Sequence, residues 1–310
     1  MTNSYHRAAA QRGGLFAILV LATFLMGSSF IAGKILLADG YPAMLLVGWR
    51  FLLAALATLP LVWLQKKPMP GVLRLRDLDV RGVATVMLIG LMQTAAVMGL
   101  LFLAMRTVSA ATAAILLFTN PLWVAVLGRL FLNEQLHGAR IAGLILGIAG
   151  VALSVGWHSH ADGGGGQWQG EAIGLLSAFC WAAATIINKR ANLPLASWSL
   201  SFAQMLTGAL ALLAIAYGLG QRWPAHTSAS QWAWFLWLAI PASTGSFGLW
   251  FLALKRGGAS RTSSFLFLAP LFTVLLSYFI LDTRLTWWQG LGAIFICVSL
   301  VLVNRLRLPS

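Results

Sequence analysis

Long apolar stretches separated by short polar segments run along the whole chain. At 1.5 Å per residue, a helix needs about 20 mostly apolar residues to cross the roughly 30 Å hydrocarbon core of a bilayer. The sequence divides into ten stretches of that kind, expected near residues 15–37, 43–64, 81–104, 108–131, 139–156, 171–188, 197–219, 231–254, 260–281 and 286–304. The pattern predicts an all-α integral membrane protein with ten transmembrane helices.

The composition supports a membrane protein. Of 310 residues, 59% are hydrophobic and 9% are charged, whereas a soluble domain carries about 25% charged residues. The net charge of +14 comes from short basic clusters between apolar runs, which is typical of anchoring to anionic lipid. No basic domain or nucleic-acid-binding motif is present in the sequence. We therefore expect membrane lipid and a small-molecule substrate as partners, and no nucleic acid.

Neither a cleaved signal peptide nor a cysteine-based site is expected. Leu15 to Leu37 is too long for the core of a cleaved signal peptide, so it is expected to be the first span. Cys180 and Cys297 lie inside apolar runs without Cys-x-x-Cys or Cys/His spacing. Disulfide and metal chemistry are therefore not expected, and no cofactor or metal site is predicted.

The Lys and Arg residues give the orientation, because they remain on the cytoplasmic side of short loops. With the N-terminus inside, the cytoplasmic set is the larger one: Arg7, Arg12, Lys66, Lys67, Arg74, Arg76, Arg81, Arg129, Arg140, Lys189, Arg190, Lys255, Arg256, Arg261, Arg305 and Arg307. The opposite side receives only Lys34, Arg50, Arg106, Arg222 and Arg284. This asymmetry predicts an N-in/C-in protein that crosses a bacterial cytoplasmic membrane many times.

The two halves of the sequence resemble each other. The segment FLAMRTVSAATAAILLFTNPLWVAVLGRLFLNEQL, from Phe102, aligns without a gap with FLALKRGGASRTSSFLFLAPLFTVLLSYFILDTRL, from Phe251. In this register Arg106 matches Lys255, and further on Gly143 matches Gly292. Earlier in each half, FLMGSSFIAGK corresponds to FCWAAATIINK. The chain thus contains an internal repeat.

The repeat implies an inverted architecture. We expect a first five-helix repeat at 1–156, a Gly-rich linker at 157–170 and a second five-helix repeat at 171–310. An odd number of spans reverses the direction in which the second half enters the membrane. Inverted repeats occur in many secondary transporters, where exchange of conformations between the halves gives alternating access.

Four short motifs stand out in the first half: Gly27-Ser28-Ser29-Phe30 followed by Lys34, Trp49-Arg50-Phe51-Leu52-Leu53, Asn120-Pro121, and Asn133-Glu134-Gln135-Leu136 with Gly143. With these motifs the chain resembles the EamA-like family of the drug/metabolite transporter superfamily, particularly its YddG-type exporters of aromatic and other neutral amino acids. The second half departs from this pattern, with Thr283 at the position of Glu134 and Asp282 one residue earlier. That departure weakens any role for the acidic residue.

Carboxylates and histidines are absent from the middle of the expected spans. The acidic residues (Asp39, Asp77, Asp79, Glu134, Asp162, Glu171 and Asp282) and the histidines (His6, His137, His158, His160 and His226) fall in loops, termini or span ends. Groups for proton relay are therefore missing from the core. We expect a facilitator, acting as a monomer.

Arg50 is the one charge well inside an expected span, roughly 10 Å below its start at 1.5 Å per residue. It could bind a substrate carboxylate through its planar guanidinium. Alternatively, it is structural, and either extends to the surface or caps carbonyls of a neighbouring helix. Gln204 occupies the matching place in the second half, and Lys34 and Lys189 are expected to be interfacial anchors.

Polar and aromatic residues also share helical faces. The candidate substrate cavity comprises Ser28, Ser29, Trp49, Arg50, Gln93, Thr94, Asn120, Trp181, Thr185, Asn188, Gln204, Thr207, Ser243, Ser246 and Trp250. The alternative for the hydroxyl residues is close helix packing. Pro121 and Pro270 are predicted to bend the fourth and ninth spans and to act as gating pivots, because proline removes a helix hydrogen bond.

The sequence thus favours a transporter that exports amino acids or similar small amphipathic metabolites. The alternatives are a multidrug or cation exporter of the same superfamily, a membrane-embedded enzyme, and a structural subunit without a translocation path. An enzyme is not expected, because no acid, base or metal constellation forms in or beside the spans.

Overall fold

A computed structural model describes residues 2–64, 77–133, 138–156, 167–257, 265, 268–283 and 286–305. Several features expected from the sequence lie outside these residues: the basic loop at 65–76, Glu134, and the glycine run of the linker.

Helices follow one another along the described chain. The first half contains α1 (Thr2–Ala38), α2 (Ala43–Leu64), α3 (Val80–Gly90), the short π-helix η2 (Leu91–Ala96), α4 (Val97–Ala104), α5 (Ala110–Leu117), α6 (Asn120–Leu132) and α7 (Gly138–Gly156). The second half contains α8 (Gln167–Ala191), α9 (Ser197–Gly218), α10 (Ala229–Ala239), the π-helix η3 (Ile240–Gly245), α11 (Ser246–Gly257), α13 (Leu268–Leu281) and α14 (Trp287–Arg305).

Within this described part, six helical segments, some made of more than one consecutive helix, are long and apolar enough to cross a bilayer. They are Gly14–Ala38, Ala43–Leu64, Val80–Ala104, Ala110–Leu132, Gln167–Ala191 and Ser197–Gly218. Shorter apolar helices cover Ile141–Gly150, Leu268–Leu281 and Trp287–Ser299. The helix of the expected sixth span begins at Gln167 rather than at residue 171, so the end of the predicted linker is helical. The protein is a multi-pass membrane protein, whereas ten spans and their orientation remain predictions.

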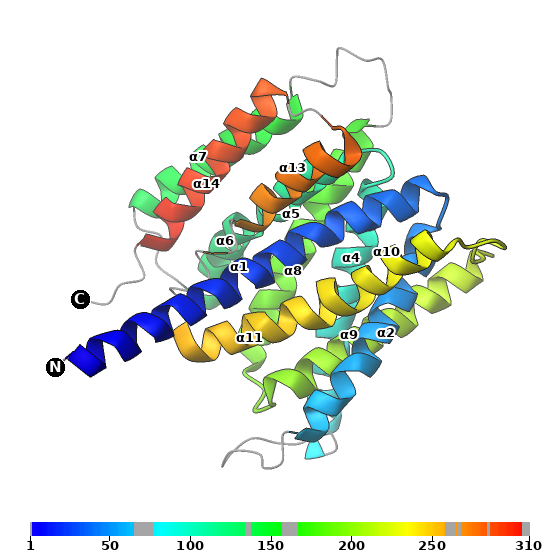
Figure 1. The fold of residues 1–310 in the computed structure, drawn as a ribbon, viewed down its shortest axis with the longest axis horizontal. Helices are drawn as coiled ribbons and strands as arrows, with labels where there is room; N and C mark the ends of the chain where they lie inside the picture. The colour runs from blue at the N-terminus through cyan, green and yellow to red at the C-terminus, as the bar shows by residue number, and fades with distance from the viewer. Residues whose placement is uncertain are drawn as a thin grey trace.

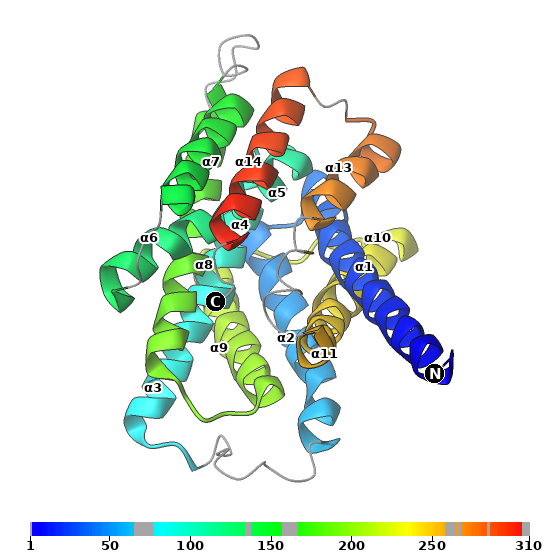
Figure 2. The same cartoon turned by 90° about the vertical axis from the view of Figure 1, so that its left-hand side faces the viewer.

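The helices of the two halves are interleaved in one bundle. Helix α2 packs against α9, and α7 packs against α14, which lies beside it in both views (Figures 1 and 2). Helix α1 packs against α10, η3, α11 and α13 of the second half. In turn, α8 packs against α3, η2, α4, α5 and α6 of the first half. The start of α1 and the end of α14 lie at the same, left-hand end of the bundle in Figure 1.

Small residues bring α7 and α14 close together. The hydroxyl of Ser299 donates to the carbonyl oxygen of Gly143, and a Cβ added at Gly150 would lie 2.8 Å from the carbonyl oxygen of Gly292. The repeat register matches Gly143 with Gly292 and Gly150 with Ser299. The two contacts therefore occupy corresponding places in the two halves, and small side chains permit the close approach of the backbones.

The two π-helices also occupy corresponding places. In the register that aligns Arg106 with Lys255, η2 at Leu91–Ala96 aligns with η3 at Ile240–Gly245. Each interrupts an α-helical segment. Such π-turns are rare in proteins, and where they occur they are often found at functional sites. Both π-helices are therefore candidate positions for a functional site.

The expected fourth span is divided into two helices. Helix α5 ends at Leu117, α6 begins at Asn120, and Pro121 lies in the first turn of α6. The hydroxyl of Thr119 donates to the carbonyl oxygen of Leu116 across this break. Pro270 lies in the first turn of α13, and most of the chain just before α13 lies outside the described residues. Their role as gating pivots remains a prediction.

The ends of α6 and α13 explain where the two repeats differ. Asn133 has a left-handed φ of 52°, and Asp282, which matches it in the repeat register, has a φ of 49°. Asn and Asp tolerate this conformation better than other residues with side chains. Asp282 therefore corresponds to the helix-ending Asn133 rather than to Glu134.

Candidate functional site

A cavity of about 240 Å³ lies beside η2, between α3, α8, α9 and α11. Its lining combines amide, hydroxyl, aromatic and apolar side chains: Phe51, Ile89, Gln93, Thr94, Met98, Trp181, Ala184, Thr185, Asn188, Ser201, Gln204, Met205, Phe247 and Trp250. None of these lining side chains carries a formal charge. The cavity suits a ligand that offers hydrogen-bonding groups and an apolar surface.

Seven residues of the predicted cavity meet here: Gln93, Thr94, Trp181, Thr185, Asn188, Gln204 and Trp250. The hydroxyl of Thr185 donates to the carbonyl oxygen of Trp181, 2.9 Å away, within α8. Across the described chain, no hydrogen bond engages the side-chain amides of Gln93, Asn188 or Gln204. Three amides with free donors and acceptors therefore line one cavity.

Sequence reasoning missed Phe247 and Ser201, which also line the cavity. Helical spacing was the available signal. Phe247 precedes Trp250 by three positions, and Ser201 precedes Gln204 by three positions. Residues at that spacing lie on one helical face.

Several predicted cavity residues lie elsewhere and contact the backbone. The hydroxyls of Ser28, Ser29 and Ser246 donate to carbonyl oxygens about one turn earlier in their own chain segments. The amide of Asn120 donates to the carbonyl oxygen of Ala178 at 3.4 Å, and Thr207 lies where a Cβ on Gly90 would contact it at 3.0 Å. These contacts fit the packing alternative for hydroxyl and small polar residues in membrane helices.

Arg50 is buried beside η3, with 3% of its surface exposed. Its Nε donates to the hydroxyl of Ser243 at 2.8 Å, and this hydroxyl donates to the carbonyl oxygen of Leu238 at 2.8 Å. The guanidinium lies 4.7 Å from the ring centre of Phe51 and 5.4 Å from that of Phe102. Arg50 therefore does not extend to the surface, and cation–π contacts contribute to holding it.

The guanidinium retains unused hydrogen-bonding capacity. Nη1 of Arg50 is buried and has no hydrogen-bond partner. Phe51, which lies under the guanidinium, lines the cavity, whereas Arg50 itself does not. The charge therefore lies behind the cavity wall in this conformation, and an unpaired donor is available there for a further ligand.

Lys34 differs from the interfacial anchor expected from the sequence. Its Nζ donates to the carbonyl oxygen of Met105 at 2.6 Å and to that of Val108 at 2.8 Å. These carbonyls follow the end of α4, where no helical partner is available to them. Lys34 thus ties α1 to the chain segment between α4 and α5.

A polar cluster joins the two halves at the end of α1. The amide of Gln231 donates to a carboxylate oxygen of Asp39 at 2.9 Å, and the hydroxyl of Tyr41 donates to that of Thr227 at 3.1 Å. The ring of Tyr41 meets that of Trp223 edge-on, with centres 4.9 Å apart. The turn after α1 is therefore held against the start of α10.

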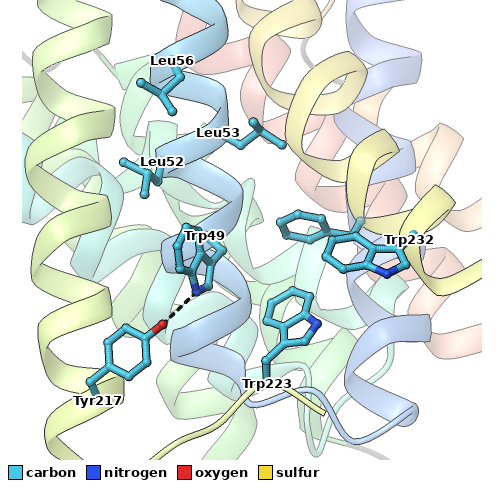
Figure 3. Close-up of a pocket in the computed structure, with 8 residues that line it drawn as sticks. Trp49, Leu52, Leu53, Leu56, Tyr217, Trp223 and Trp232 are labelled. Carbon is cyan, nitrogen blue, oxygen red and sulfur yellow. Dashed lines mark hydrogen bonds between the residues drawn. The ribbon is translucent and has the colours of Figure 1, made fainter. Parts of the chain in front are cut away.

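A second concave surface lies on the side of the bundle (Figure 3). This lateral groove has a volume of about 440 Å³ and is lined by Trp49, Leu52, Leu53, Leu56, Tyr217, Trp223, Trp232 and Phe235. The indole N–H of Trp49 donates to the hydroxyl of Tyr217 at 3.2 Å. Trp49 was predicted for the substrate cavity, and the structure places it in this groove instead.

Two matches to the same family profile divide the chain. The profile of the EamA-like transporter family matches residues 12–156 and again residues 168–305. The chain belongs to the EamA-like transporter family. It is thus a membrane transporter of the drug/metabolite superfamily, which confirms the family resemblance but does not identify the YddG type.

Relatives with similar lengths support this assignment. An uncharacterized transporter of Synechocystis is 28% identical and is aligned over 95% of this chain and 90% of its own length. The uncharacterized inner membrane transporter YedA of Escherichia coli is 24% identical, over 96% and 92% of the two chains. The uncharacterized transporter YoaV of Bacillus subtilis is 23% identical, over 91% and 94%. A crystal structure with 17% identity and a TM-score of 0.62 covers 96% of this chain and 99% of its own, and shares the fold of this EamA-like protein.

Proposed function

We propose that this EamA-like transporter exports amino acids, chiefly aromatic and other neutral ones, across a bacterial cytoplasmic membrane. The observation that carries the proposal is the cavity beside η2, with its three free amides and its aromatic walls formed by Trp181, Phe247 and Trp250. Relatives named only as transporters leave the substrate open.

A neutral amino acid fits the chemistry of this cavity. Amide oxygens accept hydrogen bonds from an ammonium group, and amide N–H groups donate to a carboxylate. The rings offer a large apolar surface and favourable edge-to-face contacts to an aromatic substrate side chain. An isolated ion would lack a charged partner among the lining residues, so a zwitterion suits the site better than a cation.

Alternating access would exchange the contacts of the two halves. In this conformation Arg50 and Ser243 close the space between α2 and η3. The corresponding residues Gln204 and Thr94, on α9 and η2, instead line the cavity. With the N-terminus inside, the cavity would face the cytoplasm, and opening of the other end would bring Arg50 to the substrate carboxylate.

The test is uptake into proteoliposomes containing the purified protein, screened over the twenty amino acids and a few cationic drugs. We expect the fastest protein-dependent uptake for aromatic and large neutral amino acids. Replacement of Gln93 by Ala should lower that uptake about tenfold or more, whereas Trp63→Ala, at an exposed position near the end of α2, should not. Uptake of the cationic drugs alone would overturn the proposal.

A further inference from the structure

We infer that the lateral groove of Figure 3 binds an anionic phospholipid, with one acyl chain along α2 and the phosphate at Arg222. This inference is independent of the transported substrate. The groove and the cavity beside η2 share no lining residue.

The position of the groove exposes it to membrane lipid. Its floor is α2 and one wall is α9, and both helices are long and apolar enough to cross a bilayer. Leu56 is 50% exposed and Trp232 is 45% exposed at its surface. A concave apolar surface on the side of a membrane-spanning bundle faces acyl chains rather than water.

The side chains that line the groove change from aliphatic to aromatic along its length. Leu52, Leu53 and Leu56 follow one another along α2, whereas the rings of Trp223 and Trp232 stack at the other end with their centres 5.8 Å apart. Tryptophan and tyrosine favour the level of lipid headgroups, and leucine favours the hydrocarbon core. This order matches the order of groups in a phospholipid.

A positive charge beside the aromatic end of the groove favours an anionic headgroup. Arg222 is exposed and directly precedes Trp223, which lines the aromatic end of the groove. The nearby carboxylate of Asp39 is engaged by the amide of Gln231. An arginine near the membrane surface attracts anionic lipid by about 1 kcal/mol, and its planar guanidinium suits a phosphate.

The size of the groove favours an acyl chain over a helix from a second copy. A helix is about 10 Å wide with its side chains and rises about 5.4 Å per turn, so about 440 Å³ is filled by roughly one turn. A single turn is too short to dock a membrane helix. An acyl chain is thinner and can follow the whole row of leucines.

The test is native mass spectrometry of the purified full-length protein, titrated with phosphatidylglycerol or phosphatidylcholine in detergent. We expect one tightly held phosphatidylglycerol per chain. Leu56→Trp, which fills the groove from an exposed position, should weaken binding about tenfold, and the milder Leu56→Phe should weaken it less. Leu210→Trp, at a similarly exposed leucine on α9 outside the groove, should bind like the wild type. Arg222→Gln should lower phosphatidylglycerol affinity about fivefold, corresponding to about 1 kcal/mol, and leave phosphatidylcholine unchanged.

Three results would overturn the inference. One is equal lipid binding by the wild type and both Leu56 variants. Another is an equal loss of binding in Leu210→Trp, which would show that the retained lipid is not held in the groove. The third is a dimer that Leu56→Trp dissociates, which would assign the groove to a second copy.

Discussion

Arg50 and Ser243 lie far apart in the chain, yet Nε of Arg50 donates to the Ser243 hydroxyl at 2.8 Å. The bond joins α2 of the first half to η3 of the second. A second contact supports the same junction, because the hydroxyl of Thr244 donates to the carbonyl oxygen of Ala54 at 3.0 Å. A buried charge thus holds together two helices from opposite halves, and we expect this junction to open during transport.

The first prediction concerns Arg50 itself. Arg50→Lys keeps the charge but loses the planar set of donors, so transport should fall about tenfold while the protein remains folded. Arg50→Ala should in addition lower stability by about 1.5–3 kcal/mol, because a hydrogen bond to a charged group is lost. Initial uptake rates and thermal unfolding in detergent measure the two effects.

Arg106 provides the control, because it is exposed in the turn that follows α4. Arg106→Lys should change neither quantity. If Arg50→Lys transports at the wild-type rate and Arg50→Ala is merely less stable, Arg50 is structural and does not meet the substrate.

The second prediction concerns the packing of α9 on η2. A Cβ added at Gly208 would lie 2.4 Å from Cβ of Thr94, so Gly208→Ala must push η2 away. Such overpacking costs about 1–3 kcal/mol and would distort the cavity wall, so melting temperature and uptake should both fall. Gly218→Ala on the same helix meets nothing within 4 Å and should leave both unchanged. A Gly208→Ala protein with wild-type stability would show that this contact gives way freely.

The third prediction concerns the α7–α14 interface. Ser299→Ala removes the hydrogen bond to the Gly143 carbonyl and should lower stability by about 1 kcal/mol. Gly150→Leu should destabilise much more, because even a Cβ there would be 2.8 Å from the Gly292 carbonyl oxygen. Gly138→Leu is the matched variant, since nothing lies within 4 Å of a Cβ at that position. Equal melting temperatures for the two leucine variants would contradict the interface described here.

Much of the helical arrangement could be predicted because lipid imposes a length on apolar segments, and the sequence repeat identifies corresponding helices. The π-helices could not be predicted. Leu91–Ala96 contains Gln93 and Thr94, and Ile240–Gly245 contains Pro241 and Ser243, but polar residues and proline also occur in ordinary membrane helices and do not identify one extra residue per turn. In the structure, η2 packs closely on α9, where a Cβ added at Gly208 would lie 2.4 Å from Cβ of Thr94.

Only some of the residues of the candidate site could be predicted from the sequence. Gln93 and Trp250 are too large or too polar for simple helix packing, and both line the cavity. Ser28 and Ser246 looked equally suitable in the sequence, but their hydroxyls bond to backbone carbonyls. A serine satisfies itself within its own helix, so its presence on a face says little about a cavity. Trp49 could not be placed from the sequence, because the rotation of α2 about its axis decides whether this ring faces the centre of the bundle or the lipid.

The fourth prediction concerns energetics. Asp39 and Asp282 lie outside the helices, and Glu171 lies near the start of α8, so none lines the cavity. A proton or sodium ion would find no carboxylate ligand beside the substrate. In liposomes the substrate should equilibrate without accumulating, at a rate nearly independent of an imposed proton or sodium gradient. Uphill accumulation driven by a pH step would contradict a facilitator and would direct attention to Glu134, Asp282 or Glu171.

The central claim is that the cavity beside η2 carries a neutral amino acid, and counterflow tests it most directly. Proteoliposomes preloaded with unlabelled L-tryptophan are diluted into labelled L-tryptophan, and the transient internal label is followed. We expect an overshoot for the wild type and for Trp63→Ala, and loss of the overshoot in Gln93→Ala and Trp250→Ala although both proteins remain folded. Counterflow that persists in both cavity variants, or is absent from the wild type for every neutral amino acid tested, would contradict it.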